Sequence, residues 1–467
     1  MARGFIALRA REASCPWDEY AETFEWKADS VRINVLKREF PLKAKLLTLM
    51  FIVLSFAVGG TLLAQTRSGE EEAGLDKLIR EALERNPEIR EIRHEVDSLE
   101  ASVSASRRWK DPVLGVEYSN VPWTDPVLST SPMSGLQFRI QQTLPAPGIN
   151  DARMAVSRAR VDVQTSRLDE VRSQLVATVR AAYWRLADVR AQEDVTRRHI
   201  ALVDELYRAV QGRYQAGFAN QGALLRLQLL RERLRDGLDD YRRDERTLTA
   251  ALNAACSMPP ERPIQTPALQ AALKPPGESP ASFVEEGMAR RGRLKQRRAE
   301  EVLARREVEL AKRGRWTEFN VWAGYRVRSD ALSDGGADFI TIGVSGTLPF
   351  DYTKRWESEA RAARLRAEAA RDAHQRVLDQ LAADVEAVLA QWERAYQRHQ
   401  RYQRSLVPTA EDTVESTLAS YRTGRATFES LYQAEAALLE LERTLLSARL
   451  ETFVAQARLR ALVGHQD

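Results

Sequence analysis

The sequence predicts a mainly α-helical protein with a small β part, built from a unit that occurs twice. Three observations lead to this prediction. Hydrophobic residues make up 44% and charged residues 29% of the 467 positions, and glycine and proline are sparse, which is typical of long amphipathic helices. Short marker motifs recur in the same order in both halves of the chain. Segments of strictly alternating polarity interrupt the helical pattern at matching places.

Charge and cysteine content exclude several functional classes. Lys and Arg number 70 against 66 Asp and Glu, and the resulting charge of +4 is spread along the chain without a basic block. A nucleic-acid partner is therefore not expected. Cys15 and Cys256 are too far apart in the sequence to argue for a disulfide framework or a cysteine-based zinc site. We expect the fold to be stabilised by packing.

Residues 1–64 are predicted to be an N-terminal extension and a signal peptide. Basic residues between positions 37 and 45 precede an apolar run over 46–58, which small residues follow. The alternative is an uncleaved anchor, because the apolar stretch approaches the length of a membrane-spanning helix. Residues before Val35 do not fit a signal peptide, so Val35 is an alternative start. We expect the mature chain to begin near Gln65.

Matching motifs define two repeats. Tyr214-Gln215-Ala216-Gly217 recurs as Tyr421-Arg422-Thr423-Gly424, and Leu144-Pro145 recurs as Leu348-Pro349. A stretch from Met258 to Pro280 holds seven of the 18 prolines and must interrupt helix. The predicted boundaries are a first repeat over 65–257, a Pro-rich linker over 258–281 and a second repeat over 282–467.

Each repeat is expected to contain a helix, a β-hairpin, a long helix, a turn and a further helix. In the first repeat the predicted elements are a helix over 75–108, strands over 112–123 and 134–145, and helices over 151–214 and 218–255. The second repeat is expected to follow the same order, with its hairpin near 317–349. A helix of about 60 residues is on the order of 90 Å long, so it belongs to a rod or a tube.

The predicted strands alternate with period two. Residues 136–144 read Leu, Phe, Ile, Gln, Leu on one parity and Gln, Arg, Gln, Thr on the other, and segments 319–328 and 339–348 alternate similarly. Alternation by itself is typical of a soluble sheet on a core. The export signal and the aromatic residues near the strand ends favour a lipid-facing barrel wall.

Four strands cannot close a barrel around a lumen, because a membrane-spanning sheet must have no open edge. Closure therefore requires several subunits. The polar parity of the strands is then expected to face the lumen and to set a mild electrostatic preference. The predicted lumen residues are Gln137, Arg139, Gln141, Arg326 and Arg328.

Five stretches of the sequence are distinctive in their order and spacing. They are Ala82–Ile89, Gln142–Gly148, and Ser405–Glu411 followed by Tyr421–Gly424 and Leu431–Glu435. Over Leu75 to Gly464 the chain resembles the outer membrane efflux protein family, the TolC type. The stretch Gln142–Gly148 is similar to the strand-to-helix junction of the heavy-metal (cation) efflux branch of that family.

The resemblance implies a TolC-like homotrimer in the cell outer membrane that extends into the periplasm. Each subunit would contribute four strands to one twelve-stranded β-barrel, which continues into a long α-helical periplasmic barrel. The implied partners are a periplasmic adaptor (membrane fusion) protein, an inner-membrane RND-type pump and outer-membrane lipid.

The resemblance also implies a narrow periplasmic tip. Glycine admits the positive φ of a tight turn between helices, so Gly217 and Gly424, with Tyr214 and Tyr421, are expected at the tip. Many family members carry acidic residues six and nine positions after the second glycine. This chain departs from that pattern there and has Ser430 and Gln433, with Glu429 as the nearest acid. These three are the candidate aperture residues.

No enzyme activity, cofactor or metal site is predicted. The five histidines are scattered on helical stretches without metal-ligand spacing, and no phosphate-binding glycine loop or nucleophile elbow is present in the sequence. We expect a passive conduit of a tripartite efflux system, carrying heavy-metal cations or small toxic compounds. The alternatives are a type I secretion duct, which has the same fold, and a periplasmic coiled-coil adaptor or scaffold.

Overall fold

The computed structural model describes residues 74–465, apart from residues 125–126, 128–130, 132, 270, 317, 332–335 and 348–351. All described residues belong to Thr66–Asp467, one of the two units into which the chain divides. The predicted extension and signal peptide over 1–64, and the Leu348-Pro349 pair, lie outside the described residues. None of the described helices has a stretch long and apolar enough to cross a membrane.

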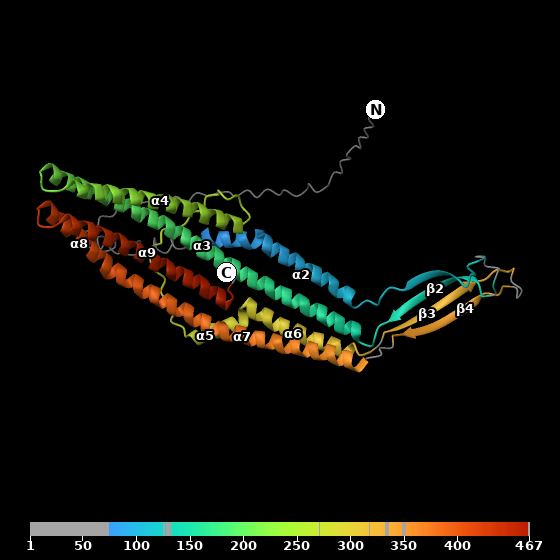
Figure 1. The fold of residues 1–467 in the computed structure, drawn as a ribbon. Helices are drawn as coiled ribbons and strands as arrows, with labels where there is room; N and C mark the ends of the chain where they lie inside the picture. The colour runs from blue at the N-terminus through green and yellow to red at the C-terminus, as the bar shows by residue number, and fades with distance from the viewer. Residues whose placement is uncertain are drawn as a thin grey trace, which may run out of the picture. The chain divides into compact units, whose positions relative to one another are not determined.

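The first half follows the predicted order with one break (Figure 1). The helix expected over 75–108 is interrupted at Asn86, between a helix over 74–85 and α2 (Pro87–Ser106). The Asn86 side chain accepts a 2.9 Å hydrogen bond from the Glu88 backbone N–H, and Pro87 has no N–H to donate. The elements that follow are β1 (Val113–Ser119), β2 (Gly135–Leu144), α3 (Ile149–Gln215) and α4 (Gln221–Ala255).

The second half repeats this order, but its long helix is not continuous. A π-helical turn separates α7 from α8 where the first repeat has the unbroken α3 of 67 residues. The Val407 N–H donates to the Tyr402 carbonyl, and Pro408, which follows, cannot donate, so the α-helical ladder is broken here. The elements are α5 (Pro280–Arg290), α6 (Gly292–Arg313), β3 (Phe319–Val327), β4 (Phe339–Gly346), α7 (Tyr352–Arg401), η1 (Tyr402–Leu406), α8 (Val407–Arg422) and α9 (Phe428–Val463).

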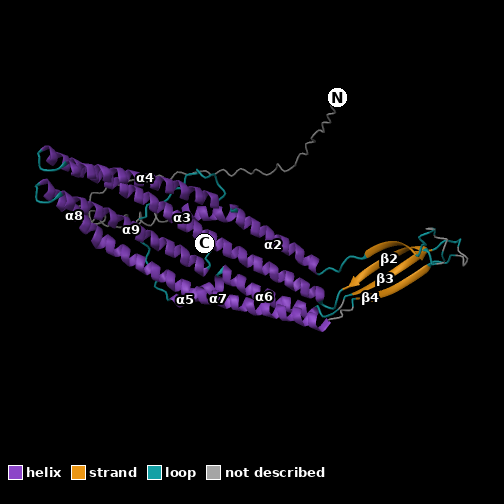
Figure 2. Ribbon diagram, viewed as in Figure 1, coloured by secondary structure: helices purple, strands orange, loops and turns teal. Residues whose placement is uncertain are grey.

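The four strands form one antiparallel sheet in the order β1-β2-β3-β4 (Figure 2). They contain 7, 10, 9 and 8 residues, so each is shorter than the segment predicted for it, over 112–123, 134–145, 319–328 and 339–348. The two hairpins pair through β2 and β3, for example at Ile140 with Ala323. This pairing leaves β1 and β4 as edge strands, each with one described neighbour.

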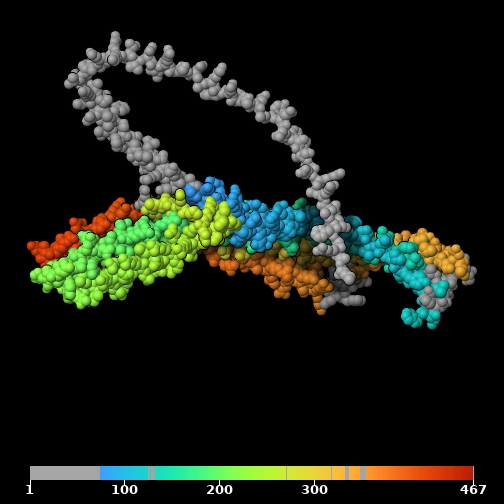
Figure 3. Space-filling view, turned by 90° about the horizontal axis from the view of Figure 1, so that it is seen from above, coloured from blue at the N-terminus to red at the C-terminus, as the bar shows by residue number. Residues whose placement is uncertain are grey.

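The helices that adjoin the sheet are arranged in the same order as the strands. Packing runs from α2 to α3, from α3 to α6 and from α6 to α7, as β1 to β4 do in the sheet. Toward the two helix turns, α4 packs on α3, α3 on α9, and α9 on α8. Figures 1 and 3 show α2 and α4 following one another along one border of this helical layer.

In both long helices, apolar residues recur every three or four positions in the sequence. Such a ladder predicts a packing seam against neighbouring helices, and the structure has one in each helix. In α3, Val179 and Leu186 are fully buried, and in α7 the equivalent ladder buries Leu381, Val385 and Ala395. At 1.5 Å per residue, α3 is about 100 Å long. Because such a helix cannot bury its stripe in one compact core, the stripe is divided among several apolar clusters along its length.

Candidate functional site

The sheet has one apolar face, which is exposed in the protomer. Residues in register lie on the same side of an antiparallel sheet, and one row crosses all four strands through Leu114, Ile140, Ala323 and Ile342. The large apolar side chains on this face that are more than one-third exposed are Leu114, Val116, Tyr118, Phe138, Ile140, Phe319, Tyr325, Val327, Ile340, Ile342 and Val344. An apolar face of this extent fits a lipid-facing wall.

The five predicted lumen residues lie on the opposite, mainly polar side. Gln137 is in register with Arg326, and Arg139 and Gln141 lie on the same parity of β2. Arg328 continues the parity of Arg326 just beyond the end of β3. The structure therefore brings these five residues to one side of the sheet.

Contacts on this polar face hold its arginines in place. Arg326 donates to Gln137 Oε1 at 2.8 Å, and Arg139 lies 3.4 Å from a Glu117 carboxylate oxygen. The Arg139 guanidinium also stacks over the Trp322 ring, 4.6 Å from its centroid. The positive charge on this side is thus partly neutralised within the protomer.

Gly217 and Gly424 lie in equivalent turns, one between α3 and α4 and the other between α8 and α9. Their φ angles are 79° and 81°, in the left-handed region that favours glycine. Each glycine N–H donates at 3.0 Å to the carbonyl of the tyrosine three residues earlier, Tyr214 or Tyr421. The two tyrosines differ, because Tyr421 is buried whereas Tyr214 is exposed.

The candidate aperture acid is paired within the protomer. Glu429 accepts a 2.9 Å hydrogen bond from Arg226 of α4 and a 3.1 Å bond from Gln433. The Ser430 N–H donates to the Thr427 hydroxyl, which caps the start of α9. The negative charge of Glu429 is therefore compensated by an arginine, and Ser430 takes part in capping the N-terminus of α9.

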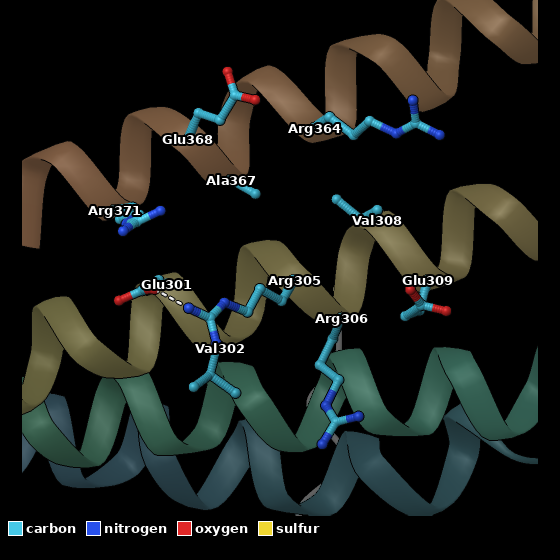
Figure 4. A pocket seen from close by; sticks show the side chains of 10 residues that line it. All are labelled: Glu301, Val302, Arg305, Arg306, Val308, Glu309, Arg364, Ala367, Glu368 and Arg371. Atoms are coloured by element: carbon cyan, nitrogen blue, oxygen red, sulfur yellow. Dashed lines mark hydrogen bonds and ion pairs between the residues drawn. The ribbon is translucent and has the colours of Figure 1, made fainter.

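Two of the grooves on the helical part are lined by charged side chains of interest. One, of about 450 Å³, lies between the two turns and is bordered by Arg213, Tyr421 and Glu429 among others. The other, of about 650 Å³, lies between α6 and α7, and Figure 4 shows the arginine and glutamate side chains that line it. Glu301 pairs there with Arg305, and Glu309 with Lys312. Its charges are mixed and partly paired, so they do not define one class of ligand.

Two ionisable side chains on the buried side of α3 were not predicted as special. His199 is almost fully buried and lies between Glu435 and Glu442 of α9, 3.0 Å from each. Asp188 is buried nearer the middle of the layer, where loss of water raises its pKa to about 6 despite the Arg449 charge. Both interrupt the row of buried apolar residues along α3. An ionisable residue at a position where the apolar spacing continues is the sequence signal that could have revealed them.

In the described residues no group of three or more His, Cys, Asp or Glu side chains is arranged to hold a metal ion. His399 of α7 is also buried among the helices. Burial and the nearby positive charge of Arg449 together lower the pKa of His399.

These features define a class of protein: a helical layer in two repeats that carries a sheet suited to lipid on one face. The model of the outer membrane efflux protein family matches residues 78–256 and 284–465, which cover both repeats. The chain therefore belongs to the outer membrane efflux protein family and is a protein of the outer membrane, as predicted. No curated protein sequence matches the chain.

The fold is shared with the solved structures of an outer membrane protein, VceC, of the outer-membrane channel OprN, and of CusC. VceC of Vibrio cholerae is 18% identical, with a TM-score of 0.70 over 84% of this chain and 96% of that chain. OprN is 15% identical, with a TM-score of 0.71 over 84% and 90%. CusC is 17% identical, with a TM-score of 0.68 over 84% and 92%. The TolC-like fold that the family resemblance implies is confirmed by these similarities.

Proposed function

We propose that the chain is the outer-membrane channel subunit of a tripartite, RND-type efflux system and forms a passive trimeric conduit from the periplasm to the exterior. The observation that carries the proposal is the two-faced sheet, with an uninterrupted row of exposed apolar side chains on one face and Gln137, Arg139 and Arg326 on the other. Such a sheet suits a boundary between lipid and a water-filled lumen.

The edge strands support assembly from several copies. β1 and β4 each have one described neighbour, so each protomer leaves two rows of backbone groups to be satisfied. Hydrocarbon cannot satisfy these groups, whereas β4 of one copy pairing with β1 of the next can. Three copies of the four-stranded sheet would close a barrel of twelve strands.

The helical borders carry opposite charge toward the turns. Residues 221–235 of α4 include four arginines and one glutamate, a net charge of +3, whereas α8 includes three acids and one arginine, a net charge of −2. α4 and α8 lie at opposite borders of the layer. Cyclic assembly would bring these borders together, with complementary charge.

The proposed transport mechanism is separation of two helical hairpins, α3–α4 and α8–α9, when a periplasmic adaptor binds near their turns. The contacts that would have to break include Arg226–Glu429 at 2.9 Å and Arg422–Glu205 at 2.8 Å. An inner-membrane pump would supply the driving force and most of the selectivity. The paired Glu429 supports a weakly selective aperture, with Ser430 and Gln433 beside it.

The test is membrane fractionation of the expressed protein combined with chemical crosslinking. We expect the protein in the outer-membrane fraction and a crosslinked product of about three protomer masses. A monomer or dimer in the soluble or inner-membrane fraction would refute the channel and support a periplasmic adaptor or scaffold. Reconstitution with an RND-type pump and its adaptor then separates efflux of metal cations or toxic compounds from protein secretion by a type I duct.

A further inference from the structure

His199 joins the two helical hairpins through both nitrogens of its ring. Nδ1 lies 3.0 Å from Glu435 Oε1, and Nε2 lies 3.0 Å from Glu442 Oε2. The histidine belongs to α3 and both glutamates belong to α9, so the contact links the α3–α4 hairpin to the α8–α9 hairpin. The two carboxylates are seven residues apart, which places them two turns apart on one side of α9.

The two-sided contact requires a particular protonation state. A neutral imidazole has one N–H donor and one acceptor nitrogen, whereas an ionised carboxylate only accepts. If His199 were neutral, its ring nitrogen without a proton would face a carboxylate oxygen. Both atoms would then present a lone pair, so they would repel each other and no hydrogen bond would form. Imidazolium has two N–H donors and satisfies both Glu435 and Glu442, so the geometry matches a protonated ring.

The surroundings make this state costly to change. His199 lies between Val195 and Val203, which belong to the apolar cluster that joins α3, α4, α8 and α9. Glu435 is fully buried, and its second carboxylate oxygen has no hydrogen-bond partner among the described residues. In this low-dielectric setting, loss of the imidazolium charge leaves Glu435 buried and uncompensated.

Other charged groups near the contact do not replace the histidine. Arg198 of α3 lies 3.7 Å from Glu442, so it compensates that carboxylate in part. Arg443 of α9 donates to the Thr196 hydroxyl at 3.3 Å, and Arg398 of α7 borders the groove that Glu435 also lines. α4 and α8 face the cluster with Leu227, Leu234 and Leu418. Their ion pairs with α3 include Arg231–Asp204, Arg422–Glu205 and Arg242–Glu193. α4 also presents Arg235 and Asp239 on a groove that Ile200 of α3 lines.

We propose that His199 is a protonation-dependent latch, which holds α3 against α9 when it is charged and releases them when it is neutral. This inference rests on the proposed function, because it assigns a regulatory contact to the separation of the same two hairpins. The class of signal is the proton concentration of the compartment that bathes the helices.

The direction of the pH effect follows from the balance around the ring. Burial disfavours the charged form, but the hydrogen bonds from His199 to Glu435 and Glu442 outweigh it and raise the pKa above the ordinary 6.5. The contact therefore contributes its full stabilisation below about pH 6.5. This stabilisation is lost as the pH rises through the raised pKa of His199. Separation releases at most one proton, so the separated fraction rises by up to about tenfold per pH unit inside that window.

The experiment is hydrogen–deuterium exchange of the trimer in membrane-mimicking lipid, from about pH 5 to about pH 10, with correction for intrinsic exchange. The reporting peptides cover residues 195–203 and 431–446. The variants are His199→Gln and Glu442→Gln. The matched control is His374→Gln, because His374 also contacts a glutamate, Glu301, at 3.1 Å, but in the α6–α7 pair and not between the two hairpins.

We expect exchange in both peptides of the wild type and the control to rise with pH by up to about tenfold per unit. In His199→Gln the rise of exchange with pH should be absent. In Glu442→Gln the rise should begin at a lower pH, because one of the two negative charges that raise the pKa of His199 is gone. A slope that is unchanged in His199→Gln, or a flat wild-type profile, overturns the latch.

Pore conductance of the same trimers in planar bilayers separates this inference from the proposed function. Conductance that rises with exchange in the wild type and is independent of pH in His199→Gln supports the latch as a regulator of the conduit. Exchange that depends on His199 without any pore at any pH refutes the channel and leaves the latch as a helix contact. Pores without a His199-dependent slope refute the latch and support the channel.

Discussion

Arg213 of α3 reaches the opposite turn, where its guanidinium donates to the Tyr421 backbone carbonyl and lies 4.9 Å from the centroid of the Tyr421 ring. The same side chain lies beside Gly424, because a Cβ added there would be 3.2 Å from Arg213 Nη1. One arginine from the first repeat therefore covers the turn of the second repeat.

Replacement of Arg213 by alanine should loosen the two turns without unfolding the helices. The lost charge-assisted hydrogen bond and ring contact together contribute about 2 kcal/mol. We expect chymotrypsin cleavage beside the exposed Phe218 to become at least about tenfold faster, because cleavage follows the opened population. Arg235→Ala, which removes a contact within α4 to Glu232, is the control. Equal cleavage of the two variants would contradict the prediction.

The two turn glycines should respond differently to alanine. Both substitutions place a side chain at positive φ and should cost about 1–2 kcal/mol of stability. Gly424→Ala should cost more than Gly217→Ala, because only its Cβ meets Arg213. Gly237→Ala in α4, where no atom of the described residues lies within 4 Å of the added Cβ, should stabilise by about 0.5–1 kcal/mol. Thermal unfolding measures all three, and a destabilised Gly237→Ala or a tolerated Gly217→Ala would contradict this order.

Adjacent residues of β4 should differ sharply in their tolerance of lysine. Ile342 lies on the exposed apolar face and Thr341 on the polar face. Ile342→Lys should lose about 2–4 kcal/mol of membrane insertion if the position is near the bilayer midplane, and should deplete the outer-membrane fraction. Thr341→Lys should insert normally. Fractionation followed by quantitative blotting measures both, and equal insertion of the two variants would contradict the assignment of the faces.

The buried Asp188 should make stability fall as the pH rises from about 4 to about 6. Its pKa is raised from 3.8 to about 6, so the folded protein holds a proton in this range that the unfolded chain releases. The loss of folding stability that ionised Asp188 causes is complete above about pH 6. It amounts to about 3 kcal/mol, at 1.36 kcal/mol per pKa unit. Asp188→Asn should flatten this part of the profile of thermal stability against pH. The net gain in stability at neutral pH should be smaller, because Arg449 loses the nearby negative charge of Asp188.

The control for this pH profile is Asp194→Asn, on the exposed side of the same helix. It should leave the wild-type slope unchanged. A slope that persists in Asp188→Asn would mean that other groups titrate in this range and would refute the assignment to Asp188.

Local periodicity predicted most of the fold. Alternation with period two assigned Gln137, Arg139, Gln141, Arg326 and Arg328 to one side of the sheet, because neighbouring residues of a strand point to opposite faces. The spacing of apolar residues predicted the seams of α3 and α7 in the same way. The break at Asn86 was missed even though its Asn-Pro signal is local, because the apolar pattern continues across it.

The sequence by itself determined the duplication, the order of helices and strands, the turns at Gly217 and Gly424, and the two faces of the sheet. Each of these depends on residues close together in the chain. Only the tertiary structure decided that Arg213 meets Tyr421, that Arg226 compensates Glu429 and that His199 lies between two glutamates. These partners are more than 200 residues apart. They meet because each packed helix takes one rotation about its own axis and one position along that axis relative to its neighbours. The sequence of a single helix does not specify either.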